Sequence, residues 1–208
     1  MEDVLDVYCR PYDPLHPVVC LDESSKQLLA EVRPPLPPES GKPERIDDHY
    51  ERRGTCNIFL ACEPLRGWRE IKVTARRTNI DWAEFVRELV DVHYPQAARV
   101  VLVMDNLNTH KPAALYQAFA PAEAKRIWDR LELHYTPVHG SWLNIAECEF
   151  SVLSRQCTNC RIPDEQALRA ATGAWQHERN RCVAKVKWQF TTADARIHLQ
   201  HLYPTIQG

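Results

Sequence analysis

The sequence predicts a single α/β domain built on a mixed sheet with helices on its faces. Short apolar runs with the length of buried strands alternate with longer stretches of helical periodicity. A chain of 208 residues is long enough for one sizeable core, and no internal repeat or low-complexity tail divides it. We therefore expect one domain over residues 1–208, with residues 1–17 as an N-terminal lead.

A β-hairpin is expected in the first half of the chain. Residues 56–62 form an apolar run, and residues 69–75 alternate between apolar and polar side chains. Pro64 and Gly67 lie between them and supply a turn. Further along the chain, we expect strands at 17–21, 100–104 and 131–135, helices opening at Pro112, Pro121 and Pro163 and spanning 143–155, and capped helices at Thr78/Asp81 and Thr191/Asp194.

Residues 32–44 hold five prolines, at positions 34, 35, 37, 38 and 43. Neither a helix nor an inner strand can continue through such a stretch. Long loops inside a compact domain are more often functional than idle. We therefore treat residues 31–55 as a Pro-rich insertion.

Composition narrows the class of protein. No apolar run approaches the ~20 residues that a membrane helix needs, and no signal-peptide pattern opens the chain. The eight cysteines then indicate reduced thiols, and the isolated Cys157-x-x-Cys160 pair lacks the companions of a zinc site. The net charge of −2 is not that of a typical nucleic-acid binder. Local charge differs, because residues 66–77 contain five basic residues and one acid.

Two of the expected strands end on an aspartate, Asp22 and Asp105. Sites in open α/β sheets form at the carboxyl ends of strands. A single aspartate there is commonly a turn or cap residue, and two followed by an acid on a helix are less common. On the helix after Leu143, Glu147 falls on a polar stripe and can face a cleft, whereas Glu149 is better explained by an ion pair or as an acid at the rim of the helix.

Three carboxylates offer hard oxygen ligands, which suit Mg²⁺ or Mn²⁺ better than zinc. Two such ions can support an in-line phosphoryl displacement, with one ion activating the attacking oxygen and the other stabilising the leaving oxygen. The sequence therefore predicts Asp22, Asp105 and Glu147 as both catalytic residues and ligands of two Mg²⁺ or Mn²⁺ ions.

Three blocks carry a family resemblance: Asp22-Glu-Ser, Met104-Asp-Asn-Leu-Asn-Thr-His-Lys111, and Tyr135-Thr-Pro-Val-His-Gly-Ser-Trp-Leu-Asn-Ile-Ala-Glu147. They resemble the catalytic blocks of DDE transposases of the IS630 family, within the Tc1/mariner superfamily. The resemblance runs from about Val18 through nearly the whole chain. It implies a ribonuclease-H-like fold, a metal-binding triad of Asp22, Asp105 and Glu147, and cut-and-paste DNA transposition at TA dinucleotides.

The resemblance also implies partners. In mariner relatives the insertion after the first catalytic strand is a clamp between protomers, so a homodimer is expected. Family members usually carry helix-turn-helix modules ahead of the catalytic domain, and these are absent here. We therefore expect a separate helix-turn-helix protein as a possible partner, and a cytoplasmic bacterial protein associated with the nucleoid.

Eight further residues are candidates for contact with DNA, the transposon ends and target. Arginines of the hairpin would follow phosphates, although a basic run is more often a solvated face. The Asn and His after Asp105 are as readily turn residues, the loop His can be solvated, and the Trp can pack beneath its helix. The candidates are Arg66, Arg69, Arg76, Arg77, Asn106, His110, His139 and Trp142.

Two rival functions stay open at the level of the sequence. One is an inactive or domesticated transposase-derived module that binds nucleic acid without cutting it. The other is a related phosphoryl-transfer enzyme, such as an RNA-directed nuclease on the same fold. Fold analogy alone does not choose a substrate.

Overall fold

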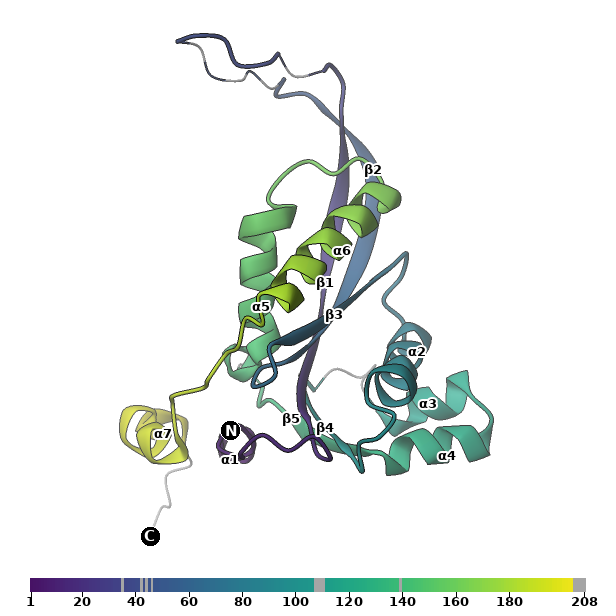
Figure 1. The fold of residues 1–208 in the computed structure, drawn as a ribbon, viewed down its shortest axis with the longest axis vertical. Helices are drawn as coiled ribbons and strands as arrows, with labels where there is room; N and C mark the ends of the chain where they lie inside the picture. Colours follow the sequence, from purple (N-terminus) through teal and green to yellow (C-terminus); the bar gives the residue numbers. More distant parts are fainter. Residues whose placement is uncertain are drawn as a thin grey trace.

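The computed structural model describes residues 1–203 apart from residues 35, 42, 44, 46, 107–110 and 139. A five-stranded sheet has the order β3-β2-β1-β4-β5 (Figure 1). Antiparallel pairing joins β1 to β2 and β2 to β3, and parallel pairing joins β1 to β4 and β4 to β5. The strands are β1 (Val18–Glu31), β2 (Tyr50–Glu63), β3 (Trp68–Thr74), β4 (Val100–Met104) and β5 (Leu131–Tyr135). The predicted mixed sheet and ribonuclease-H-like fold class are confirmed.

Helices cover both faces of the sheet (Figure 1). One face carries α5 (Ile145–Leu153), the π-helical turn η3 (Ser154–Thr158) and α6 (Glu165–Arg181). The other carries α2 (Asn79–Glu88), the π-helical turn η1 (Leu89–His93), α3 (Pro112–Ala118) and α4 (Pro121–Asp129). The remaining helices are α1 (Glu2–Tyr8), η2 (Ser141–Leu143), α7 (Thr192–His198) and η4 (Gln200–Leu202).

Successive residues of the inner strands feed two different cores. Cys20 of β1 and Val103 of β4 are buried in the cluster beneath α5, with Leu143 and Ala146. Leu21 of β1 lies in the cluster on the α2 side, with its neighbours Val19 and Leu102. This alternation follows from the period of two along a strand. The alternation also determines toward which face of the sheet each side chain beyond the paired residues points.

Helix ends follow the local rules that the sequence indicated. Thr78 and Asp81 form a capping box at the start of α2, and Thr191 and Asp194 form one at the start of α7. Both were predicted from spacing alone and are confirmed. The predicted hairpin is also confirmed, with Glu63 of β2 paired to Trp68 of β3.

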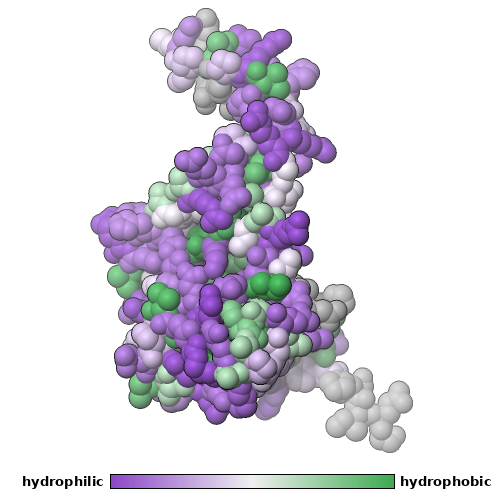
Figure 2. Space-filling view, turned by 90° about the vertical axis from the view of Figure 1, so that its right-hand side faces the viewer, coloured by the Kyte–Doolittle hydropathy of each residue, from purple (hydrophilic) through white to green (hydrophobic). Residues whose placement is uncertain are grey.

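The predicted boundaries of the first two strands are wrong. We expected β1 to end near residue 21 and β2 to begin near residue 56, but each has 14 residues. The added halves pair with each other as far as Glu31 and Tyr50, and form an arm, defined here as residues 27–55. The arm extends from the body in Figure 1, and its described surface is largely hydrophilic in Figure 2. Leu28 and Ala30 are buried at alternate positions, but the prolines that follow and the polar start of β2 masked this strand signal.

Two further features complete the fold. The N-terminal lead contains a helix, α1, that the sequence did not indicate, and α1 contacts α7. All eight cysteines are free thiols, as predicted. Among the described helices, none combines the length and apolar character that crossing a bilayer requires.

Candidate active site

Asp22 and Asp105 occupy equivalent positions in the register of two neighbouring strands. The last parallel pair between β1 and β4 joins Cys20 to Val103, and each aspartate lies two residues beyond its member of that pair. Adjacent strands are about 4.8 Å apart. Two residues along a strand restores the same face, so both aspartates address the side covered by α5. Asp22 is therefore inside a long strand, at the point where its parallel neighbour has just ended.

Glu147 enters from α5. It stands in the first turn of that helix and is half-buried. The surroundings of Asp22 raise its pKa from 3.8 to about 7. Burial is the largest cause, and the negative charges of Asp105, Glu23 and Glu147 add to it against the lowering effect of the Glu23 backbone N–H. Three acids distant in sequence thus repel one another in one place.

Asn144 holds the helix with Glu147 against the strand with Asp22. Its side-chain oxygen accepts from the Ala146 N–H at 3.1 Å and caps α5, while its Nδ2 donates to the Leu21 carbonyl at 3.0 Å. Tyr8 of α1 donates its hydroxyl proton to the Leu143 carbonyl at 2.7 Å. The sequence interpretation missed both roles, although Asn is a favoured N-cap residue.

The carboxylates do not converge on a single point. In the described part of the chain, the group of His, Cys, Asp or Glu whose ligand atoms all lie within 4.8 Å of one another is Glu70, Glu88 and His93. Asp22, Asp105 and Glu147 therefore do not meet that mutual distance. Three carboxylates on one ion would have to lie closer together than this, whereas two ions ~3.5–4 Å apart can each take different ligands. The like charges around Asp22 are of the sign that divalent cations offset.

The group of Glu70, Glu88 and His93 has other partners. Lys72 Nζ lies 2.8 Å from a Glu88 carboxylate oxygen, and Gln176 Nε2 donates to Glu70 at 2.9 Å. A cation and an amide already supply hydrogen bonds to these acids. The group is thus accounted for as a polar cluster between β3 and η1.

One predicted DNA contact is wrong. The Arg69 side chain is only 1% exposed, and its guanidinium faces Glu149 at 2.6 Å, so it cannot reach a phosphate in solvent. A basic residue on an alternating strand faces solvent or the interior according to register, and Arg69 faces the interior. The same contact confirms the ion-pair interpretation of Glu149.

The other arginines of the hairpin are accessible. Arg66 is 49% exposed and lies 3.6 Å from Glu63, and Arg76 is exposed. Arg77 is 45% exposed, with Nε 3.9 Å from a carboxylate oxygen of Glu23. Glu23 follows Asp22 directly in β1 but leaves the strand on the opposite face, so Arg77 lies near the strand that carries Asp22 and not beside its carboxylate. Glu23 itself is buried and was not singled out from the sequence, although an acid adjoining a candidate ligand was a visible signal.

The remaining candidates lie in two loops. Asn106 is exposed directly after Asp105. Trp142 is 42% exposed and meets the Phe190 ring edge-on at 6.1 Å, so the packing expected beneath its helix is partial. His110 and His139 lie outside the described residues.

Comparison with protein families identifies the class of the chain. A family model described as "DDE superfamily endonuclease" matches residues 17–169, which is more than half of the chain. That range contains all three acids. The chain belongs to the DDE superfamily endonucleases, as the resemblance implied. Membership of the IS630 family in particular stays a prediction.

Two solved structures are also similar. The crystal structure of the Mos1 strand transfer complex has 13% identity and a TM-score of 0.45, over 86% of this chain and 54% of that chain. The Mos1 transposase paired-end complex with left transposon end has 13% identity and a TM-score of 0.30, over 82% and 55%. The chain thus spans about half the length of these chains. No protein of curated function matches the sequence.

Proposed function

We propose that this chain is the catalytic domain of a DNA transposase that cuts DNA and transfers its ends, with Asp22, Asp105 and Glu147 as the catalytic residues. The observation that carries the proposal is the level placement of Asp22 and Asp105 on neighbouring strands, with the charge of Glu147 acting on Asp22 from α5. Membership of the DDE superfamily endonucleases supports it.

The three carboxylates would hold two Mg²⁺ or Mn²⁺ ions. When bound, such ions lower the pKa of an attacking water or hydroxyl and neutralise charge on the transferring phosphate. Asp22 and Asp105 would hold their oxygens from the rigid sheet, and Glu147 would complete the ligand set from α5. Asp22 must lose its proton to serve as a ligand, and its raised pKa sets the pH at which this becomes favourable.

Other residues of the chain would bind and orient DNA. Arg76 and Arg77 follow the end of β3 and Arg66 lies in the turn before it, and all three offer exposed positive charge; Asn106 follows Asp105 directly. Trp142, which lies in η2 just before α5, is 42% exposed and offers part of its indole ring to a ligand. Roles for His110 and His139 in holding a phosphate rest on the sequence pattern alone. Phosphate contacts of this kind position a duplex without reading its sequence.

The finer features belong to the same proposal. We propose an IS630-type transposase of the Tc1/mariner superfamily, insertion at TA dinucleotides, and a homodimer in which the arm reaches the second protomer. Recognition of the transposon ends would come from helix-turn-helix modules. Each extends the family resemblance of the three sequence blocks.

A nicking assay on supercoiled DNA with Mg²⁺ or Mn²⁺ tests the proposal. The wild-type chain should nick, and Asp105→Asn should abolish nicking while leaving the melting temperature unchanged or higher, because an acidic repulsion is relieved. Asp129→Asn, on an exposed acid of α4, is the matched control and should nick normally. Mn²⁺-dependent nicking retained by Asp105→Asn would refute the assignment. Parallel DNA, RNA and hybrid substrates separate a DNA enzyme from an RNA-directed nuclease.

A further inference from the structure

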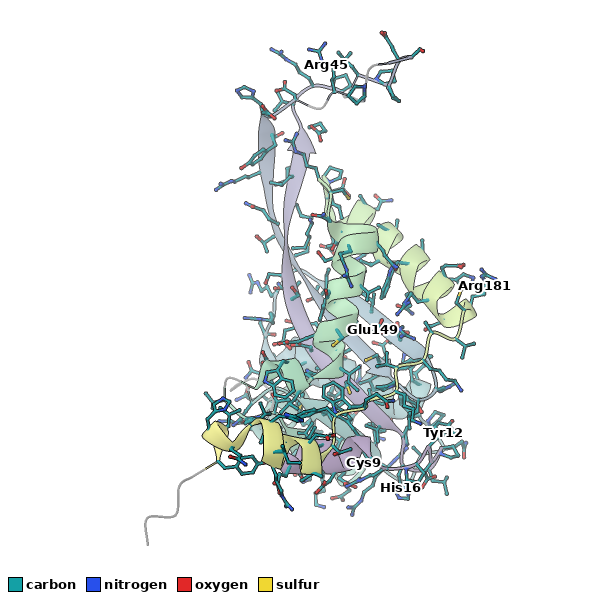
Figure 3. All side chains as sticks on the ribbon, turned by 90° about the vertical axis from the view of Figure 1, so that its left-hand side faces the viewer. Cys9, Tyr12, His16, Arg45, Glu149 and Arg181 are labelled. Atoms are coloured by element: carbon teal, nitrogen blue, oxygen red, sulfur yellow. The ribbon has the colours of Figure 1, made fainter. Side chains whose placement is uncertain are left out.

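A buried carboxylate of α5 is held by two guanidinium groups. Glu149 is 2% exposed and lies in the body of the molecule, close to α6, in Figure 3. Arg69 of β3 donates to it from Nε at 2.9 Å and from Nη2 at 2.6 Å. Arg179 of α6 donates from Nη2 to both oxygens at 3.1 and 3.2 Å. One acid of α5 is thus fixed to both a strand and a second helix.

Arg69 is itself held at several points. Its backbone N–H donates to Asn180 Oδ1 and its carbonyl accepts from Asn180 Nδ2, each at 2.8 Å. Nη2 also donates to the Ala184 carbonyl. These bonds cover the free edge of β3 with α6 and leave the guanidinium one orientation. A rigid fork of this kind fixes the geometry of the carboxylate that it binds.

Both carboxylate oxygens of Glu149 lie within hydrogen-bond distance of guanidinium nitrogens of Arg69 and Arg179. Such an arrangement is typical of a charged pair with fixed geometry.

Helix geometry relates Glu149 to Glu147. At about 100° per residue, two positions on a helix differ by about 200°, so the two side chains leave α5 on nearly opposite sides. Holding Glu149 to the interior therefore sets the rotation of α5 about its axis and the direction of Glu147. Asn144 fixes the end of the helix, buried apolar residues pack one face of α5 on the sheet, and the ion pair adds a polar constraint on the rotation.

Stability alone gives a weak reason for this pair. Replacing a buried ion pair by apolar residues of similar volume is often neutral or stabilising, because two charges no longer need to be desolvated. Within the described residues, Nη1 of Arg69 is buried without a hydrogen-bond partner, which adds a cost. A core built for stability would be better served by apolar side chains here.

We propose that Arg69 and Glu149 are positioning residues that fix the rotation of α5 and so direct Glu147 toward Asp22. This inference rests on the proposed function, in which Glu147 is a catalytic residue. Neither Arg69 nor Glu149 touches the reacting atoms. Their effect reaches the reaction through the placement of one carboxylate.

The double variant Arg69→Met/Glu149→Leu tests the inference, because it removes both charges of the pair. Arg179 also loses its contact with Glu149, but its side chain is 23% exposed and can turn its guanidinium to solvent. It should unfold cooperatively at the wild-type temperature or above. Its kcat for DNA nicking should fall about tenfold or more, the size found when groups supporting a metal ligand are removed. KM for DNA should not change. The matched control is Arg126→Met/Asp91→Leu, a bidentate pair remote from α5, which should keep wild-type kcat.

Two companion variants keep the test decisive. If the double variant does not fold, Arg69→Lys decides, because it keeps the charge and loses the fork. A smaller fall in kcat at unchanged KM supports positioning, and wild-type kcat in either folded variant overturns it. Glu147→Gln separates the two proposals. If Glu147→Gln abolishes nicking but the double variant nicks like the wild type, only the positioning role is contradicted. If the wild-type chain does not nick DNA, both proposals are contradicted.

Discussion

Asn144 hydrogen-bonds through its side chain to the backbone carbonyl of Leu21, the residue before Asp22, at 3.0 Å. The same side chain caps α5, whose first turn carries Glu147. A single buried amide therefore joins the strand and the helix that supply two of the three acids. The distance between these acids depends on it.

Asn144→Ala should damage stability and site together. The change removes a helix cap, worth about 1 kcal/mol, and leaves the buried Leu21 carbonyl unpaired, at about 1–3 kcal/mol. Urea denaturation should show a loss on the order of 2–3 kcal/mol. Thr191→Ala, which removes only the cap of α7, should cost about 1 kcal/mol and leave nicking unchanged. Equal losses and equal nicking in both variants would contradict the proposed role.

Asp22→Asn should remove a pH dependence of folding. Because the pKa of Asp22 rises from 3.8 to about 7 on folding, the folded state binds more protons between these values. Stability contributed by the protonated carboxyl is thus lost as pH rises from about 4 to 7. The shift of about 3 units corresponds to at most about 4 kcal/mol.

The measurement is urea denaturation in chelator across that pH range. The gain in stability of Asp22→Asn over the wild type should grow with pH and level off above about pH 7. A difference independent of pH would show that the carboxyl does not titrate as the geometry requires. Asp13→Asn is a suitable control, since its exposed carboxyl has a lowered pKa and should give no gain that grows over this range.

The sequence carried the local part of this site. The residues before Asp22 and Asp105 are apolar runs that could only be buried strands, and Glu147 sits on the polar stripe of an obvious helix. Chain-local rules also placed both capping boxes. These features need only neighbours within a few residues, so pattern and propensity suffice for them.

The long-range part was beyond the sequence. Arg69 and Glu149 are 80 residues apart, and the local sequence around each residue does not indicate its partner. Arg69 looked like its exposed neighbours because charge alone does not tell which face of a strand is buried. The arm escaped detection for a similar reason, since it is held by pairing of its two strands and by contacts with residues far along the chain, such as the Leu29 N–H to the Ile162 carbonyl.

The exposed arginines after β3 should contribute to the salt dependence of DNA binding. Each phosphate contact contributes about 0.9 to the slope of log K against log salt. Arg76→Ala/Arg77→Ala should therefore lower that slope by up to about 1.8. Arg126→Ala/Arg169→Ala, on exposed paired residues elsewhere, should leave it unchanged. Fluorescence anisotropy over a salt series measures both, and identical slopes would remove these arginines from the interface.

Gly67 should tolerate no side chain. It has φ +76°, and an added Cβ would lie 2.8 Å from the carbonyl carbon of Val183. Gly54 also has positive φ, +93°, but faces open space. Both alanine variants bear backbone strain of about 1–2 kcal/mol, and only Gly67→Ala adds a steric clash of about 1–3 kcal/mol. Urea denaturation should separate them, and equal losses would show that the turn and Val183 are not in contact.

Calorimetric titration with Mn²⁺ at pH 8 tests the central claim most directly, that Asp22, Asp105 and Glu147 hold the metal. The account predicts two ions per wild-type chain, loss of binding in Asp105→Asn, and unchanged binding in His93→Ala, which alters the other cluster of possible ligands. Binding that survives Asp105→Asn, or that disappears in His93→Ala, would contradict it.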